Sequence, residues 1–333
     1  MPPILRPLQH SSGDLLADRR AAYAESLAES GDFAAAADLM RQALELAPAW
    51  TAGWSRLGDY CERGGDLDGA LAAWRRVEAL DRAGIFGADL KLAAHGVAPV
   101  VTSTPTAYVE ALFDDYASRF ETALLQRLHY EAPRELATRI VETLETRGLA
   151  QLARAVDLGC GTGLMGEHLR HLVSFLEGVD LSAGMIEESQ RKGIYDRLEQ
   201  AELTAFLGQH AGQIDLLTAA DVFNYCGALP PVLAAAAQAL RPGGLLGFTL
   251  EAHGGPEPMV LRPSLRFAHE AGATRSALAA AGFEILRFDE AVLRFDGGEP
   301  VAGYLVVAAK AAPAEAVAAD LAQAATGRPA AVH

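Results

Sequence analysis

The sequence has few cysteines and a deficit of positive charge. Its 333 residues include three cysteines, Cys61, Cys160 and Cys226, whose odd number and wide spacing exclude a closed disulfide framework. Lys and Arg total 28 against 43 Asp and Glu, which leaves a formal net charge of −15 at pH 7. A surface this negative repels phosphate backbones and anionic lipid heads, so the sequence predicts neither nucleic acid nor a membrane as a partner.

The sequence also lacks long apolar runs. It contains no stretch of about 18 uninterrupted apolar residues, and its first 20 residues lack the apolar segment of a signal peptide. Together with the cysteine usage, this indicates a reducing compartment, and we expect a cytoplasmic protein. Half of the residues are apolar and 21% are charged, as in ordinary globular proteins. The length is about twice the 150 or so residues of a typical domain, which predicts two domains.

An internal repeat lies near the start of the chain. Sliding the sequence by 34 residues superposes Gly31 and Asp32 on Gly65 and Asp66. This period is the length of a tetratricopeptide unit, and residues 17–84 resemble a pair of such units. The resemblance implies antiparallel helix pairs, which could bind a protein partner.

The pattern changes after the repeats. Residues 96–106 carry two prolines and no charge, as is typical of a linker. From Ala107 onward, two amphipathic helical patterns are followed by short apolar runs that alternate with helices, which predicts a mostly parallel sheet covered on both faces. We expect five parts: a disordered start (1–16), tetratricopeptide-like repeats (17–97), a linker (98–106), an α/β domain (107–310) and an Ala-rich tail (311–333).

The strongest signal for chemistry is the segment VDLGCGTG, residues 156–163, between a predicted strand and a predicted helix. Glycines at such a turn let a ligand approach the backbone amides. Asp180 ends the next predicted strand, where a carboxylate can accept hydrogen bonds from both hydroxyls of a ribose. The segment therefore predicts a nucleoside-like ligand. A dinucleotide is disfavoured because Leu164 stands where the G-x-G-x-x-G fingerprint needs its third glycine.

This segment resembles the first motif of the class I S-adenosylmethionine-dependent methyltransferases. The later segments GVDLSAGMIEES, QAELTAFL, IDLLTAADVFNY and LRPGGLLGFTLE follow in the order of that family. The resemblance implies a Rossmann-like, doubly wound α/β fold with a seven-stranded sheet, preceded by a small all-α tetratricopeptide domain. It also implies S-adenosylmethionine as the cofactor and methyl transfer to an acceptor, with a small molecule favoured over a protein. The whole arrangement is similar to a bacterial group of predicted methyltransferases that carry tetratricopeptide repeats.

The same resemblance implies which residues bind the cofactor. They are Asp157, Gly159, Cys160, Gly161, Gly163, Asp180, Leu181, Met185, Glu202, Asp221 and Tyr116. Asp157 and the glycine amides would hold the methionine portion, Asp180 the ribose and Glu202 the adenine amino group, with Asp221 at the mouth of the site. Tyr116 lies on a helix that would cover the ligand, although its spacing is also typical of an ordinary packed helix face.

Methyl transfer is an in-line displacement, in which the protein mainly aligns the reacting groups. A base is needed only when the acceptor keeps its proton at neutral pH. The candidates at strand ends are His269, His253 and Tyr225, and a structural role is open for each of them. His168 and His171 lie three apart on a predicted helix, but no third ligand has a useful spacing, so we expect no metal.

Two other functions stay open at this point. A nicotinamide-dependent oxidoreductase would share the early strand–helix–strand order, and Asp180 would suit its ribose as well. Alternatively, the chain could be a scaffold whose repeats bind a partner and whose second domain only senses the ligand or has lost catalysis. Stabilisation by S-adenosylmethionine but not by NAD would exclude the first alternative, and turnover would exclude the second.

Overall fold

The computed structural model describes residues 11–99, 101–117, 130–296 and 298–311. Most of the expected disordered start and of the Ala-rich tail lies outside these ranges. The helices of the first part are α1 (Leu15–Glu29), α2 (Phe33–Leu46), α3 (Thr51–Arg63), α4 (Leu67–Leu80), α5 (Ala88–Ala94) and α6 (Thr106–Tyr116). None of the helices within the described ranges is long and apolar enough to cross a bilayer.

The second part alternates helices and strands. Its elements are α8 (Ala132–Thr146), β1 (Leu152–Leu158), α9 (Leu164–Leu169), η2 (Arg170–Leu172), β2 (Val173–Asp180), α10 (Ala183–Lys192), β3 (Arg197–Gln200), α11 (Leu203–Leu207), β4 (Ile214–Ala219), η3 (Phe223–Tyr225), α12 (Leu229–Ala239), β5 (Leu240–Ala252), β6 (Met259–Leu261), β7 (Phe267–His269), α13 (Ala271–Ala280), β8 (Phe283–Asp296) and β9 (Glu299–Lys310). The elements η2 and η3 are single 3-10 turns.

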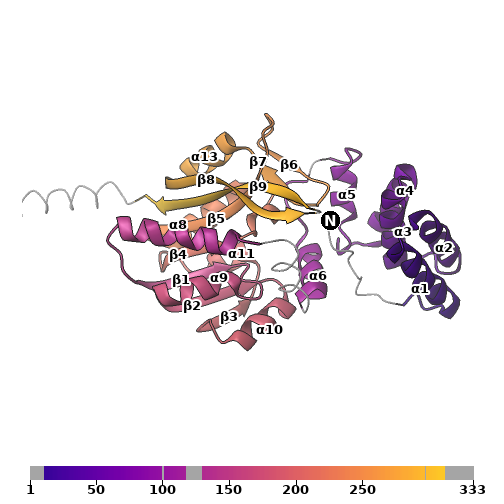
Figure 1. Cartoon of the computed structure of the whole chain (residues 1–333), viewed down its shortest axis with the longest axis horizontal. Coiled ribbons are helices and arrows are strands. Elements are labelled where there is room, and N and C mark those ends of the chain that lie inside the picture. Colours follow the sequence, from indigo (N-terminus) through magenta and orange to yellow (C-terminus); the bar gives the residue numbers. More distant parts are fainter. Residues whose placement is uncertain (1–10, 100, 118–129, 297, 312–333) are drawn as a thin grey trace, which may run out of the picture.

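Helices α1–α4 form two helix pairs with equivalent turns (Figure 1). Gly31 and Gly65 have φ of 89° and 81°, a conformation that favours glycine. Asp32 and Asp66 follow them and cap α2 and α4, each accepting a hydrogen bond from the backbone N–H three residues on. The repeat of the sequence is therefore also a repeat of local structure.

This helical region has a core of its own. Met40, Trp50 and Trp74 are buried in it, and α5 packs against its last helix. A smaller apolar cluster, to which α5 contributes Leu90 and α6 contributes Tyr108, joins the region to the rest of the molecule. Figure 1 shows α5 and α6 between the helix pairs and the sheet.

The sheet has the expected doubly wound arrangement, with an addition. Strands β3, β2, β1, β4 and β5 are parallel neighbours in that order, β9 lies antiparallel beside β5, and β8 lies antiparallel beside β9. This path of seven strands forms a Rossmann-like mixed sheet. The expected number of seven strands is too low, because the sheet contains two more strands. Strand β7 pairs with the last two residues of β5, and β6 pairs with β7. The β6–β7 hairpin escaped the sequence analysis because strands of three residues are too short to show an alternating pattern.

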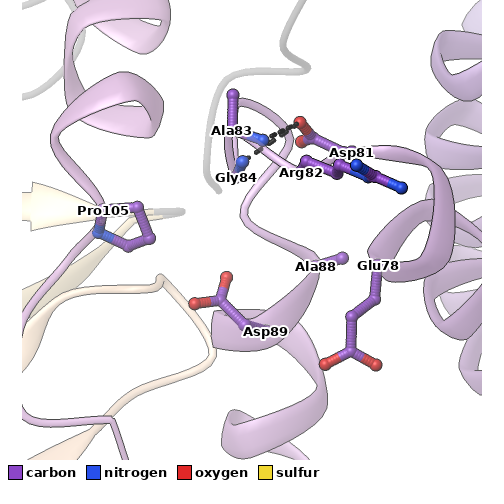
Figure 2. A pocket seen from close by; sticks show the side chains of 8 residues that line it. All are labelled: Glu78, Asp81, Arg82, Ala83, Gly84, Ala88, Asp89 and Pro105. Atoms are coloured by element: carbon purple, nitrogen blue, oxygen red, sulfur yellow. Dashed lines mark hydrogen bonds between the residues drawn. The ribbon is translucent and has the colours of Figure 1, made fainter.

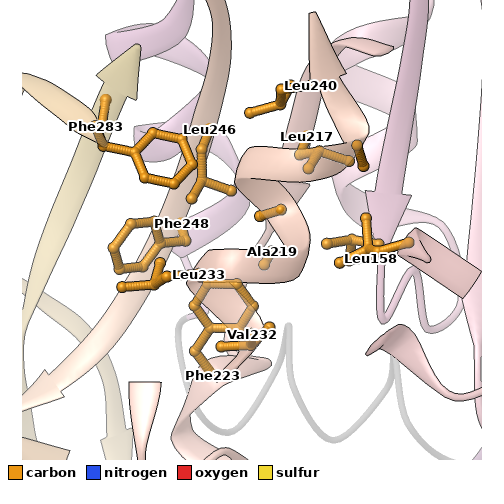
Figure 3. Close-up of a cluster of buried hydrophobic side chains, with 14 of the residues drawn as sticks. Leu158, Leu217, Ala219, Phe223, Val232, Leu233, Leu240, Leu246, Phe248 and Phe283 are labelled. Atoms are coloured by element: carbon orange, nitrogen blue, oxygen red, sulfur yellow. The ribbon is translucent and has the colours of Figure 1, made fainter. Parts of the chain in front are cut away.

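Apolar clusters lie on both faces of the sheet. Neighbouring residues such as Leu216 and Leu217 of β4 belong to different clusters, because successive side chains of a strand point to opposite faces. Helices α8 and α9 cover one face, and α11, α12 and α13 cover the other. Figure 3 shows the second cluster, in which Phe223, Leu233 and Phe248 pack together. Burial on both faces explains why the parallel strands read as continuous apolar runs.

The segment expected to be a linker is docked on the α/β part. The backbone N–H of Thr104 donates to the carbonyl of Tyr225, and the N–H of Ala228 donates to the carbonyl of Thr102. Helix α6 then begins at Thr106 and packs on α10. The chain between the helical region and the sheet therefore runs beside the segment that follows β4, where the candidate site lies.

Candidate functional site

The glycine-rich turn joins β1 to α9 at the carboxyl edge of the sheet. Gly159, Gly161 and Gly163 have φ of 61°, 54° and 94°. A Cβ atom at Gly159 would lie 2.5 Å from Cγ2 of Val222, so close packing also requires glycine there. The amides of Cys160, Gly161 and Gly163 donate to acceptors within the chain, so only part of the turn is open to a ligand in this structure.

Asp157 lies next to the end of β1 and is 1% exposed. Its Oδ2 accepts a hydrogen bond from the hydroxyl of Tyr195 (2.7 Å), and its Oδ1 accepts one from the hydroxyl of Thr218 (2.8 Å). Burial raises the pKa of Asp157 to about 6, although these two hydrogen bonds act in the opposite direction. Within the described ranges no cationic side chain forms an ion pair with it. A buried carboxylate that has no paired cation suits a positively charged group of a ligand.

Asp180 ends β2 and is 7% exposed. Its Oδ2 accepts from the backbone N–H of Gly161 (2.9 Å) and its Oδ1 from that of Ser182 (2.8 Å), while burial raises its pKa to about 6. Each carboxylate oxygen has more than one acceptor site. Asp180 can therefore hold the glycine turn and still accept hydrogen bonds from the hydroxyls of a ligand.

Helix α6 brings a third carboxylate to this edge, which the sequence analysis missed. Oδ1 of Asp114 accepts from the Oγ of Ser182 (2.5 Å) and from the backbone N–H of Gly184 (3.1 Å). Its charge also contributes to the raised pKa of Asp180. The sequence shows Asp114 only as a polar position on an amphipathic helix, and its partners are set by the packing of α6 on α10.

The other expected cofactor residues lie around these carboxylates or beside them. Met185 is fully buried in the first turn of α10, and Cys160 is buried in the glycine turn, where burial raises the pKa of its thiol well above the usual value. Leu181 follows Asp180 and is half-buried. The carboxylate of Glu202 caps α11, so it already has a structural role. Nothing is described of the side chain of Tyr116, which ends α6.

A second polar group follows β4. Asp221 has a φ of 62°, which is uncommon for a residue other than glycine. Its carboxylate accepts from Nη1 of Arg294 (2.7 and 2.6 Å) and from Nδ2 of Asn224 (2.6 Å). Nη2 of Arg294 donates to Glu251, and both of these residues are 2% exposed. Asp221 is therefore part of a buried ion-pair network, which joins the segment after β4 to β5 and β8.

The two candidate histidines are engaged in the fold. His269 in β7 is 3% exposed, its Nε2 lies 2.8 Å from the carbonyl of Gly227, and burial lowers its pKa. The neutral ring thus donates from Nε2, while Nδ1 is buried with no hydrogen-bond partner among the described residues. His253 lies 2.6 Å from the carbonyl of Glu257 through Nε2 and accepts the N–H of Gly255 through Nδ1, so it holds its own loop together.

The third candidate, Tyr225, lies in the second polar group. It ends η3, and its hydroxyl accepts a hydrogen bond from Nε of Arg266 (3.0 Å). The segment that leads to Tyr225 packs against the glycine turn, because a Cβ at Gly159 would lie 2.5 Å from Cγ2 of Val222. Burial raises the pKa of Tyr130, which precedes α8, well above the usual value. The structure therefore brings Asp157, Asp221 and Tyr225 to one region, although they come from separate segments.

A pocket of about 290 Å³ lies elsewhere, where α4 meets α5 and the start of α6 (Figure 2). Its lining residues are Glu78, Asp81, Arg82, Ala83, Gly84, Ala88, Asp89 and Pro105. The carboxylate of Asp81 accepts hydrogen bonds from three backbone N–H groups of the turn that follows it, so it has a structural role. Within the described ranges no three His, Cys, Asp or Glu side chains are placed to hold a metal ion.

The segment that contains the glycine turn is similar to known proteins. Residues 156–246 match the family model described as a methyltransferase domain. The chain is 34% identical over 122 residues to malonyl-[acyl-carrier protein] O-methyltransferase of Enterobacter lignolyticus (36% of this chain, 48% of the relative). It is 38% identical over 113 residues to trans-aconitate 2-methyltransferase of Pseudomonas paraeruginosa (32% of this chain, 39% of the relative). The chain thus spans about half the length, or less, of these curated relatives.

Solved structures also resemble the chain. Magnesium protoporphyrin IX methyltransferase of Synechocystis PCC 6803, solved with bound SAH, matches with a TM-score of 0.49 and 17% identity, covering 62% of this chain and 99% of that one. The family match confirms the prediction of a class I methyltransferase domain with S-adenosylmethionine as its cofactor. It falls on the glycine turn and the strands around it, which are the segments that carried the resemblance in the sequence.

Proposed function

We propose that this chain, whose residues 156–246 form a class I S-adenosylmethionine-dependent methyltransferase domain, transfers a methyl group to a small-molecule or carrier-bound acceptor. The observation that carries the proposal is the pair of buried carboxylates, Asp157 and Asp180, at the two strand ends beside the glycine turn. The names of the relatives refer to malonyl-[acyl-carrier protein] and trans-aconitate, which supports a carrier-bound or small-molecule acceptor. NAD is disfavoured because the matched segment follows the methyltransferase pattern.

When bound, S-adenosylmethionine supplies a methyl group on a positively charged sulfur. We assign the ribose hydroxyls to Asp180 and the ammonium end of the methionine portion to Asp157, since a carboxylate with spare acceptor sites suits both. The other cofactor contacts proposed are Gly159, Cys160, Gly161, Gly163, Leu181, Met185, Glu202, Asp221 and Tyr116. The protein's main task is to align the acceptor with the methyl group, and alignment can lower the barrier by several kcal/mol.

Among the three candidate bases, the geometry favours Tyr225. Its hydroxyl lies in the second polar group, whereas both ring nitrogens of His253 are engaged within a loop. His269 keeps one free nitrogen, but that atom is buried between β7 and the segment that follows η3. A base is dispensable if the acceptor group is already ionised at neutral pH.

We also propose that helices α1–α4 are two tetratricopeptide units that present a surface to a protein partner. The equivalent caps of α2 and α4 and the shared core of the two pairs support this proposal. The negative charge of the chain argues against nucleic acid as that partner. The cysteine usage supports a cytoplasmic location.

Calorimetry with S-adenosylhomocysteine, the demethylated product, tests the proposed function. We expect binding to the protein and a thermal stabilisation of about 2.7 kcal/mol at a hundred times the dissociation constant. Asp180→Asn should weaken binding at least about tenfold, because it removes a charged acceptor. The matched control is Asp289→Asn, which removes a half-exposed carboxylate paired with Arg139 on the surface and should leave the affinity unchanged.

Two results would contradict the proposal. Stabilisation by NAD but not by S-adenosylhomocysteine would favour the oxidoreductase. Equal affinity in the wild type and in Asp180→Asn would remove Asp180 from the ribose. Turnover is tested separately, by transfer of a radioactive methyl group from S-adenosylmethionine to a small-molecule extract, and binding without any transfer would favour the ligand-sensing scaffold.

A further inference from the structure

The β6–β7 hairpin carries an arginine without a counter-ion. Nε of Arg266 donates to the hydroxyl of Tyr225 (3.0 Å). In the part of the chain that the structure describes, its side chain makes no other hydrogen bond and no carboxylate lies within 4.0 Å of it. The planar end of the guanidinium therefore retains donors for a ligand.

The charges around Arg266 are already matched among themselves. Arg294 pairs with both Asp221 and Glu251, and Arg262 lies 3.6 Å from the second oxygen of Glu251. This region thus contains three guanidinium groups and two carboxylates, and Arg266 is the guanidinium that pairs with neither carboxylate. Burial alone lowers the pKa of Arg266, but the nearby Tyr225, Asp221 and Glu251 raise it on balance, so the side chain stays charged. Arg266 is half-buried and its guanidinium lies 5.8 Å from the centre of the Tyr225 ring. A partly buried charge without a counter-ion is destabilising, and an anionic ligand would reduce that cost.

Arg266 lies beside the region that holds the cofactor carboxylates. Its partner Tyr225 stands three residues after Val222, and Val222 packs against Gly159 of the glycine turn. Because η3 directly follows β4, Tyr225 and its arginine partner also lie at the carboxyl edge of the sheet.

The surroundings of this arginine are aromatic and apolar. The ring of Phe113 from α6 packs edge-on against Tyr225, with ring centroids 5.5 Å apart. Tyr108 of α6 and Leu265 of the hairpin belong to the same apolar cluster. Hydrogen bonds to a charged group are strongest where water is excluded, so a single arginine in this setting can select one anionic group of a ligand.

We propose that Arg266, oriented by Tyr225, binds a carboxylate of the methyl acceptor, and hence that the acceptor is a carboxylic acid. The inference rests on the proposed function and names the substrate class that it leaves open. A planar guanidinium end matches a carboxylate through two parallel hydrogen bonds. The single unmatched positive charge balances one carboxylate, whereas a phosphate dianion would leave a second negative charge next to Asp221 and Glu251.

The test is calorimetric titration of the protein, saturated with S-adenosylhomocysteine, with malonate, succinate and tricarballylate at constant ionic strength. We expect at least one of these acids to bind the wild type and its fully methylated ester not to bind. In Arg266→Gln the dissociation constant should rise at least about tenfold, and Arg266→Lys should recover part of the loss. Arg275→Gln is the matched control, since Arg275 lies over the ring of Phe288 and away from the hairpin.

The affinity for S-adenosylhomocysteine separates the outcomes. An unchanged affinity in Arg266→Gln shows that the variant is folded; if the variant fails to fold, Tyr225→Phe replaces it, with an expected severalfold loss of carboxylate affinity. Equal carboxylate affinity in the wild type and in Arg266→Gln overturns the inference, as does failure of all three acids to bind while S-adenosylhomocysteine binds. Failure of S-adenosylhomocysteine to bind the wild type contradicts the proposed function itself.

Discussion

The proposed site has a cofactor half around Asp157 and Asp180 and an acceptor half around Asp221, Glu251 and Arg266, and the two halves hold their carboxylates in opposite ways. In the cofactor half, Asp157 and Asp180 accept hydrogen bonds from hydroxyls and backbone amides, which leaves their negative charge without a cation in the described structure. In the acceptor half, Asp221 and Glu251 are neutralised by Arg294, and a further arginine remains. The first half suits a cationic ligand and the second an anionic one, which is the pairing that methyl transfer from a sulfonium to a carboxylic acid would need.

Removing the central arginine of the acceptor half should have the largest effect. Arg294→Met leaves the buried Glu251 and the half-buried Asp221 without their shared cation, so we expect the free energy of unfolding to fall by about 3–5 kcal/mol. Urea unfolding monitored by circular dichroism measures this loss. Arg287→Met on the same strand is the control. It breaks a half-exposed pair with Glu142 and should cost about 1 kcal/mol or less. Equal losses in the two variants would contradict the comparison between the halves.

The backbone of the cofactor half gives the next prediction. Gly159 and Gly193 have φ of 61° and 64°, so alanine should strain both backbones by about 1–2 kcal/mol. A Cβ at Gly193 meets no atom within 4 Å, whereas one at Gly159 meets Val222 at 2.5 Å. We expect Gly159→Ala to lose about 1–3 kcal/mol more than Gly193→Ala in thermal unfolding, because of the added clash. It should also weaken S-adenosylhomocysteine binding, and a Gly159→Ala protein as stable as Gly193→Ala would contradict the packing argument.

A smaller effect is expected for the pH dependence of S-adenosylhomocysteine binding, which tests the carboxylates of the cofactor half. The pKa of Asp157 and of Asp180 is about 6 in the free protein. Protonation removes the negative charge that binds the ammonium group and strengthens the hydrogen bonds from the ribose. If binding requires one of these groups to be ionised, the affinity for S-adenosylhomocysteine should fall about tenfold for each pH unit below 6. Titration calorimetry between pH 5 and 7.5 measures this, and Asp180→Asn should flatten the profile. A constant affinity over this range would contradict the assignment.

The same pKa values determine how the stability of the free protein depends on pH. The folded pKa of each group lies above its model value of 3.8, so the folded state binds the proton more tightly than the unfolded state. The stabilising contribution of protonation is therefore present below about pH 4 and is lost as the pH rises through about 6.

The glycine turn and the position of Asp180 beside it could be predicted from the sequence because the two are close together along the chain. Gly161 and Asp180 are 19 residues apart, within one strand–helix–strand unit, and their hydrogen bond follows from the parallel pairing of β1 and β2. The glycines of the turn mark a backbone that other residues rarely adopt, so they are visible without any tertiary information. The alternation of strands and helices and the helix pairs follow from equally local patterns.

The acceptor half could not be predicted because its contacts join distant segments. Arg294 and Asp221 are 73 residues apart, and Arg266 and Tyr225 are 41 apart. An arginine in a strand of alternating polarity looks like a solvent-exposed position, and only the packing of β8 beside β9 and β5 buries Arg294. The same holds for Asp114, whose partners on α10 lie 68 and 70 residues away.

By itself, the sequence determined the alternation of strands and helices, the repeat of the helix pairs and the glycine turn, because each depends on side-chain period or on backbone conformations that few residue types adopt. Its resemblance to a known family indicated the type of domain. Only the tertiary structure decided which charges neutralise one another and which arginine is left unmatched. Electrostatic interactions depend on distance and burial, and both arise only when segments remote in the chain come together.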